Sequence, residues 1–183
     1  PPNLLVGTSS WSSSDWLGPF YPPNLKPGQF IEAYARKFSA VEIDSTYYSI
    51  PPPHVVANWR EKTPPGFIFT AKVPGAITHE KVLKDCQAEF TTFLNNISLL
   101  GDRLGPLLLQ FPYFNRNVFS SRAPFEKLLT PFLKTLPKEF KFALEIRNKN
   151  WISWDFLELL RDHSVAFALV AQAWMPPIDT FAK

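Results

Sequence analysis

Polar side chains that could do chemistry recur near the ends of short apolar runs in this sequence. They are Glu42, Asp44, Lys72, Gln110, Glu145 and Arg147. Three acids and two bases that meet in one small volume shift one another's pKa values, and such shifts give a site an acid or base that works near neutral pH. We therefore predict one polar site, and its catalytic candidates are Glu42, Lys72 and Glu145.

The two cations in this set have the most specific chemistry. Lys72 could hold an anionic oxygen or, with a lowered pKa, act as a base or a Schiff-base amine. Its structural alternative is a salt bridge to Glu42 or Asp44. Arg147 could likewise hold an anion, and its structural alternative is an ion pair with Glu145.

Further side chains could complete a ligand site. The candidate ligand-binding residues are Trp11, Asp44, Tyr48, His79, Gln110, Arg147 and Trp151. His79 lies in a predicted loop, where it could serve as a general acid or base or could cap a helix. Aromatic residues near strand ends could stack on sugars or bases, although a chain with 17 Phe residues also uses aromatics in its core.

The sequence lacks the motifs of common cofactors. It has no Walker-type or G-x-G-x-x-G segment, which argues against ATP and dinucleotides, and we predict no cofactor. One loop histidine with Glu42, Asp44 and Glu145 could hold a metal ion, but barrel metallonucleases use many more ligands, so we predict no metal ligands. The single Cys86 excludes a disulfide within the chain and a thiolate metal site.

Length and charge set broad limits on the fold and the partners. The 183 residues suit one domain with a full core, and we expect a single domain over residues 1–183. The net charge of +3 is spread along the chain, which is weak evidence for a nucleic-acid partner. No stretch reads as a membrane span or a signal peptide, so we expect no membrane partner and a reducing, cytoplasmic setting.

Strand-like and helical stretches alternate along the chain. Strands are expected at Leu4 to Thr8, Ala40 to Ser45, Phe67 to Val73, Pro106 to Phe111, Lys141 to Arg147 and Val165 to Ala171. Helices are expected at Gly28 to Phe38, Pro53 to Lys62, Asp85 to Leu100, Pro124 to Leu136 and Ser153 to His163. Strict alternation predicts parallel strands joined by right-handed crossovers, in a doubly wound sheet or a barrel.

Side-chain parity within the strands favours the barrel. Val41 and Ile43 share one face, while Glu42 and Asp44 share the other. A barrel turns its apolar face outward to its helices, so polar side chains converge on the axis at the C-terminal strand ends. A doubly wound sheet carries helices on both faces and would bury these polar groups without reason.

We therefore predict an α/β fold of the TIM-type β/α-barrel class. A complete barrel of this class has eight strands and about 250 residues. Only six strands are readable here, so the barrel should be incomplete or open, with C-terminal units missing. The unpaired sheet edges leave self-association open as a further property.

Several motifs, in order along nearly the whole chain, resemble those of the YecE-like barrels, the domain-of-unknown-function family 72. They are GTSSW from Gly7, DW from Asp15, FYP from Phe20, EIDSTYY from Glu42, Lys72 with ITH from Ile77, LG from Leu104, QFP from Gln110 and EIR from Glu145 with Trp151. The chain departs from the family pattern at Asp44, where Asn is usual, and at Asn148, where His is frequent. The resemblance implies a TIM-type barrel similar in kind to endonuclease IV and xylose isomerase, without an established reaction.

Function remains open between three classes. The leading hypothesis is a pocket for a small anionic or sugar-like ligand at the C-terminal strand ends, with acid–base catalysis that needs no metal. The first alternative is a nucleic-acid-binding or nuclease-like barrel resembling endonuclease IV. The second is a non-catalytic scaffold, and the sequence leaves open whether the protein is an enzyme.

Overall fold

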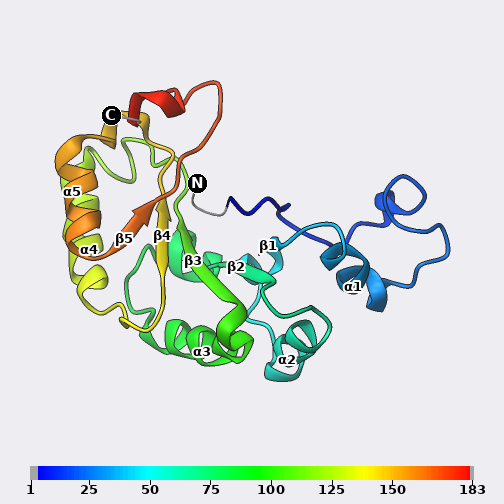
Figure 1. Ribbon diagram of the computed structural model, residues 1–183. Coiled ribbons are helices and arrows are strands. Elements are labelled where there is room, and N and C mark those ends of the chain that lie inside the picture. Colours follow the sequence, from blue (N-terminus) through cyan, green and yellow to red (C-terminus); the bar gives the residue numbers. More distant parts are fainter. Residues whose placement is uncertain (1–3, 182–183) are drawn as a thin grey trace. The chain divides into compact units, whose positions relative to one another are not determined.

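The computed structural model describes residues 4–181 of the chain. Within them a parallel sheet has five strands, which follow one another in chain order (Figure 1). They are β1 (Ala40–Ile43), β2 (Ile68–Lys72), β3 (Leu104–Gln110), β4 (Phe142–Glu145) and β5 (Val165–Phe167). The predicted α/β class is confirmed. The sheet is not closed into a barrel in this part of the chain, because β1 and β5 are the two ends of the strand order.

A helix lies in each of the five places where the sequence predicts one. The helices are α1 (Phe30–Ala35), α2 (Pro53–Glu61), α3 (Gln87–Ile97), α4 (Arg122–Lys134) and α5 (Trp154–Asp162). Pro53 occupies the first turn of α2, where its missing N–H costs no helical hydrogen bond, and Ser153 stands at the N-cap position of α5 without a side-chain capping bond. The first helix is shorter than predicted because Pro27–Gln29 forms a separate 3₁₀ turn before it.

The chain divides into two compact units. The first unit comprises the residues up to Pro74 together with Ala88–Gly105, and the second comprises Gly75–Gln87 and the residues from Pro106 onward. The first unit therefore holds β1, β2 and helices α1 to α3, and the second unit holds α4, α5, β4, β5 and most of β3.

In the first unit, alternate strand residues point to a buried and to a half-buried face. Val41 and Ile43 of β1 and Phe69 and Ala71 of β2 are buried, and their neighbours along each strand are partly exposed. This is the period-two pattern that the sequence predicts. Gly105 allows a close approach of chain segments, because a Cβ there would lie 2.7 Å from Ile68 Cγ2.

The predicted strand at residues 4–8 is wrong, because this segment forms no strand beside β1. Thr8 accepts one backbone hydrogen bond from Glu42 N at 2.9 Å. The Thr8 N–H instead donates to the Tyr34 hydroxyl at 2.8 Å, and that hydroxyl donates to Ala40 O at 3.0 Å. The Tyr34 hydroxyl thus bonds to backbone groups of Thr8 and Ala40 that would otherwise be available for strand pairing. Gly7 lies so close to β1 that a Cβ on it would be 2.1 Å from Ala40 O.

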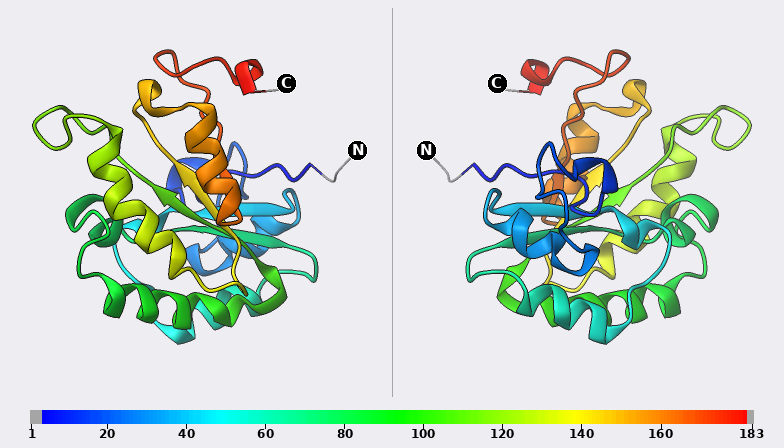
Figure 2. Two further views of the ribbon diagram at one scale, coloured as in Figure 1. Left: turned by 90° about the vertical axis from the view of Figure 1, so that its left-hand side faces the viewer. Right: turned by 90° about the vertical axis from the view of Figure 1, so that its right-hand side faces the viewer.

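In the second unit, α4 and α5 lie side by side along the strands (Figures 1 and 2). Their apolar faces are buried: Phe125 and Leu129 of α4 and Phe156 of α5 are fully enclosed. The ring of Phe125 lies 5.0 Å from that of Phe111, directly after β3, and 5.5 Å from Trp151. Burying such large rings is the main stabilising term for this helix–sheet contact. None of the helices within residues 4–181 is long and apolar enough to cross a membrane.

Candidate functional site

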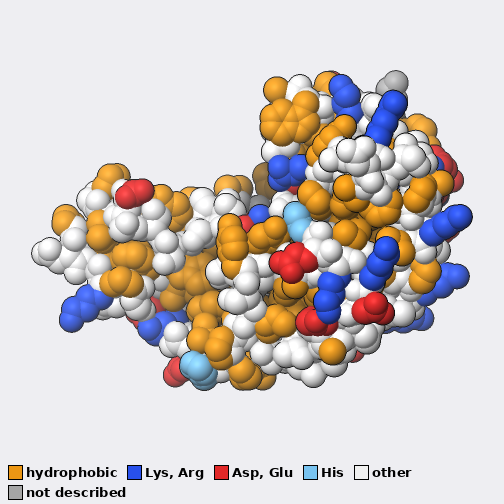
Figure 3. All heavy atoms as spheres, turned by 180° about the vertical axis from the view of Figure 1, so that it is seen from behind, with side chains coloured by type: hydrophobic (Ala, Val, Ile, Leu, Met, Phe, Trp, Pro, Cys, Tyr) orange, Lys and Arg blue, Asp and Glu red, His pale blue; other side chains and the backbone are white. Residues whose placement is uncertain are grey.

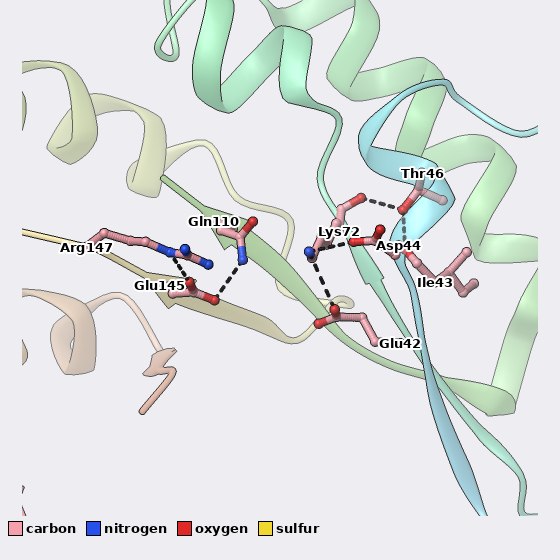
Figure 4. A network of polar contacts seen from close by, with 8 residues as sticks. All are labelled: Glu42, Ile43, Asp44, Thr46, Lys72, Gln110, Glu145 and Arg147. Carbon is pink, nitrogen blue, oxygen red and sulfur yellow. Dashed lines mark hydrogen bonds and ion pairs between the residues drawn. The ribbon is translucent and has the colours of Figure 1, made fainter. Parts of the chain in front are cut away.

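The predicted polar residues form two groups, one in each unit. In the first unit, Lys72 lies between two carboxylates, with its Nζ 2.6 Å from Asp44 Oδ1 and 3.7 Å from Glu42 Oε1 (Figure 4). We call these three residues the Lys72 cluster. Their meeting follows from the strand register, since Ile43 pairs with Ala71 and the next residues along are Asp44 and Lys72.

The buried Thr46 holds the end of this strand pair. Its hydroxyl lies 2.7 Å from both Ile43 O and Lys72 O, so its single proton is shared between two backbone carbonyls (Figure 4). It sits in the 3₁₀ turn Asp44–Tyr47, which directly follows β1. A buried hydroxyl with such partners fixes the backbone on which Asp44 and Lys72 stand.

The Lys72 cluster carries two negative charges and one positive charge. The Lys72 side chain is 15% exposed and its carboxylate partners are more exposed still. Lys72 thus forms salt bridges to both Glu42 and Asp44, which is the structural role that the sequence offered as the alternative to a catalytic one. An ammonium flanked by two carboxylates is a weak attractant for a further anion.

The aromatic candidates of the first unit have different surroundings. Trp11 packs edge-on against Trp59 at 5.4 Å and Phe69 at 6.3 Å, and its carbonyl accepts a hydrogen bond from Tyr21. Trp11 is therefore part of the packing. The Tyr48 ring is largely exposed and lies edge-on to the Tyr47 ring, with the ring centroids 5.0 Å apart.

In the second unit, Glu145 is the centre of the other group. Its Oε2 accepts a hydrogen bond from Gln110 Nε2 and its Oε1 accepts one from Arg147 Nε, each at 2.9 Å (Figure 4). We call these three residues the Glu145 cluster. Gln110 and Glu145 are direct partners in the β3–β4 register, and Arg147 lies two residues beyond Glu145 on the same side of the chain. Glu145 is only 7% exposed, so the hydrogen bonds from these two donors take the place of those that water would make to the buried carboxyl group.

Arg147 also lines a cavity of about 620 Å³ in the second unit. Other cations line it too: Arg116, Arg122 and Lys149, and Glu126 is the only acid among the described residues that line it. Aromatic side chains provide much of the remaining wall, among them Tyr113, Phe114, Trp151 and Trp174. A concave site of this volume with a few charged groups has the character of a small-molecule pocket.

Arg122 is fully engaged with its own protein. It donates to Ser153, Asp155 and the Trp151 carbonyl, and its Nε lies 2.8 Å from Glu126 Oε1. This network joins the first turn of α4 to the first turn of α5. The hydrogen bond from Ser153 and the contact with Arg122 lower the pKa of Asp155 to about 2.

A buried amide shapes one wall of the cavity. Asn148 Nδ2 donates to Phe114 O at 2.8 Å, and Phe114 N donates to Asn148 Oδ1 at 2.9 Å. Both polar ends of this side chain are therefore used on one residue's backbone. Trp151, a predicted ligand residue, stacks on Phe114 at 6.0 Å and is largely buried, so only part of it can face the cavity.

His79 lies in a π-helical turn, Ala76–Glu80, rather than in a loop without regular structure. Its Nδ1 lies 2.9 Å from the Thr78 hydroxyl, and it is not among the residues that line the cavity. The described residues 4–181 contain no group of three or more His, Cys, Asp and Glu side chains placed to hold a metal ion. Cys86 is a buried thiol.

Sequence reasoning missed several cavity residues in the loop after β3 and in the turn after β4. They are Tyr113, Arg116, Phe119, Ser120, Ser121 and Lys149. The available signal was position: loops at the C-terminal ends of parallel strands are where such folds place their binding residues. The stretch from Tyr113 to Arg116 combines two aromatic rings and a cation there.

The predicted family is confirmed by sequence comparison. The family model "Protein of unknown function DUF72" matches residues 5–181. The UPF0759 protein YecE of Escherichia coli is 34% identical over 152 residues, which cover 82% of this chain and 50% of that protein. The UPF0759 protein YunF of Bacillus subtilis is 28% identical over 165 residues, which cover 85% of this chain and 54% of that protein.

Solved structures agree with this assignment. A DUF72 family protein from Thermotoga maritima is 35% identical with a TM-score of 0.72, over 89% of this chain and 63% of that chain. Another from Enterococcus faecalis, 23% identical with a TM-score of 0.64 over 89% of this chain and 59% of that chain, shows the likeness of fold alone. The chain spans about half the length of the curated relatives it matches. Because the family model covers nearly all of it, the chain belongs to the DUF72 family of proteins of unknown function.

Proposed function

We propose that this protein binds a small anionic ligand in the cavity of its second unit, and that Arg147 contacts the anion. The observation that carries the proposal is the position of the Arg147 side chain. Glu145, which also accepts a hydrogen bond from Gln110, holds it on one side, while the same side chain lines the cavity and remains 32% exposed. A guanidinium fixed in this way is preorganised for a carboxylate or phosphate.

The charge balance around the cavity supports an anion rather than a neutral ligand. Arg122 is compensated by Glu126 and Asp155. Arg116 and Lys149 have no ion-pair partner among residues 4–181. Two uncompensated cations therefore remain at the cavity, and they attract negative charge.

Glu145 acts through Arg147 in this proposal. It is not among the residues lining the cavity, so it is a positioning residue that fixes the guanidinium and supplies a compensating charge. Two sets of roles stay predictions: the catalytic roles of Glu42, Lys72 and Glu145, and the ligand roles of Trp11, Asp44, Tyr48, His79, Gln110 and Trp151.

The barrel assignment is also a proposal. Consecutive parallel strands, intervening helices and polar side chains at the C-terminal strand ends support an open part of a TIM-type barrel. Closure would need strands beyond those described in residues 4–181.

Ligand-induced thermal stabilisation tests the binding proposal. The purified protein should gain thermal stability with inorganic phosphate or glucose 6-phosphate but not with glucose, which lacks the charge. At ten times Kd the gain is about 1.4 kcal/mol. The Arg147→Ala variant should lose this gain while its circular dichroism spectrum stays unchanged.

Arg161→Ala is the matched control, because Arg161 is an exposed arginine on α5 that pairs with Glu158 and does not line the cavity. It should keep the full response. If the anion stabilises Arg147→Ala as much as it stabilises the unmodified protein, Arg147 does not bind the anion. No response to any anion would refute the proposal and favour the scaffold hypothesis.

A further inference from the structure

We infer that the anion bound in this cavity carries an aromatic base, so that the ligand class is a nucleotide. The inference rests on the proposed function and adds the second half of the ligand. Its basis is a pair of exposed rings at the same cavity: Tyr113 is 68% exposed and Trp174 is 57% exposed.

These two rings differ from the other aromatics of the cavity. Phe114, Phe119 and Trp151 pack on one another or on Phe125, with ring centroids 5.0 to 6.3 Å apart. Tyr113 and Trp174 contact no other ring among residues 4–181. Large rings left open to water beside a cavity are suited to stacking on a planar ligand.

Hydrogen bonds hold the backbone next to both rings. Tyr113 precedes Phe114, whose N–H and carbonyl are both bonded to the buried Asn148. Trp174 precedes the buried Met175, whose N–H donates to Gln172 O at 2.9 Å. Rings carried on a fixed backbone lose less conformational entropy when a ligand binds.

Side chains that could bind a phosphate line the same cavity. Arg116 follows Tyr113 by three residues and Lys149 follows Asn148 directly, and both cations line the cavity. Ser120 and Ser121 add hydroxyl donors, and the side chain of Ser121 makes no capping bond to α4. A phosphate prefers this combination of cations and neutral donors.

The cavity volume favours a single nucleotide over a long strand. About 620 Å³ is in the range of pockets for small organic ligands. A strand-binding protein shows a continuous basic groove. On the face shown in Figure 3, Asp and Glu side chains lie among the Lys and Arg side chains.

Calorimetric titration with matched probes tests the inference. The probes are adenosine 5′-monophosphate, ribose 5-phosphate, which lacks the base, and adenosine, which lacks the phosphate. The nucleotide should bind about tenfold more tightly than ribose 5-phosphate, because one stacked base contributes on that scale. Tyr113→Ala and Trp174→Ala should each remove most of this advantage and leave the affinity for ribose 5-phosphate unchanged.

Two control variants separate stacking from general damage. Tyr113→Phe keeps the ring and should keep the advantage of the nucleotide. Trp154→Ala removes an exposed tryptophan of α5 that does not line the cavity, and it should change neither affinity. Equal affinity for nucleotide and ribose 5-phosphate, or no effect of the two alanine variants, would overturn the inference.

The outcomes also separate this inference from the proposed function. If ribose 5-phosphate binds through Arg147 and the base adds nothing, the anion site stands and the nucleotide assignment falls. If no probe binds, both fall. A ten-nucleotide oligothymidylate could instead bind at least tenfold more tightly than the mononucleotide, in a way that depends on Tyr113 and Trp174. This result would overturn the mononucleotide assignment and identify single-stranded nucleic acid as the ligand of the same stacking rings.

Discussion

The Lys72 cluster and the Glu145 cluster have the same origin in sequence and different consequences. Each joins polar side chains at the C-terminal ends of neighbouring parallel strands. In the first, a single cation lies between two carboxylates. In the second, a single buried carboxylate lies between an amide and a guanidinium, and the guanidinium reaches a cavity.

The number of acids per cation decides what each cluster can do. Two acids compensate Lys72 more than fully, so its ammonium has little attraction left for a ligand. In the Glu145 cluster the acid has only one cationic partner, and that partner is a planar group with further donors. A buried acid such as Glu145 can therefore act indirectly, by holding an arginine side chain in place at the edge of a cavity.

The largest effect on stability is expected from Glu145→Ala. It removes a buried acceptor of two hydrogen bonds and leaves Gln110 and Arg147 without their partner. Because Arg147 is partly exposed and can regain water, we expect a loss of about 2 kcal/mol in the free energy of unfolding, below the range for fully buried pairs. Urea denaturation measures it.

Glu145→Gln is the control for this loss. The amide keeps the side-chain volume and an oxygen that can accept a hydrogen bond from Arg147 or Gln110, so the loss should be smaller than for alanine. A loss below about 0.5 kcal/mol in the alanine variant would mean that the buried carboxylate does not hold the cluster together.

A smaller effect is expected from Lys72→Met. The pairs that it removes are partly exposed to solvent, so the free energy of unfolding should fall by about 1 kcal/mol or less. The thermal response to phosphate should remain that of the unmodified protein. Should this variant instead lose the response, Lys72 would be an anion-binding residue and the contrast between the two clusters would disappear.

The smallest effect is expected from Asp155→Asn, and it depends on pH. The pKa of Asp155 in the folded protein is lowered from 3.8 to about 2, so the folded state favours the ionised form. The stabilising contribution is therefore present above pH 4 and is lost as the pH falls through the folded-state pKa. At pH 7 the variant should melt a few degrees below the unmodified protein at most.

Melting temperatures measured from pH 7 down to about pH 3 check this sign. The difference between the two proteins should begin to shrink below about pH 4. Glu158→Gln on the exposed face of α5 is the control, since Glu158 pairs only with the exposed Arg161. A difference that grows towards low pH would contradict the lowered pKa.

Much of the fold could be read from local pattern. The alternation of Val41, Glu42 and Ile43 predicted the buried and half-buried faces that β1 shows, because strand geometry fixes parity whatever the surroundings. Proline and N-cap signals placed the starts of α2 and α5 closely. The segment from residue 4 to residue 8 failed because the Tyr34 hydroxyl takes the backbone bonds that a strand needs.

The site was only partly readable. The pairing of Gln110 with Glu145 and of Lys72 with Asp44 depends on the register between neighbouring strands. The alternation of residues along a strand predicts which face a side chain lies on, but not which residue lies opposite it. The wall formed by Tyr113, Arg116 and Trp174 lies on loops and turns, where no periodic pattern marks a residue as exposed to a cavity.

The sequence by itself determined the family, the order of helices and strands, and the polar character of the strand ends, since these follow from local residue patterns. The tertiary structure decided which charges meet. It gave Lys72 two acids and gave Glu145 an arginine that reaches a cavity. The physical reason is that a charge is compensated by whatever lies within a few ångströms, and those neighbours come from strands and turns far apart in the chain.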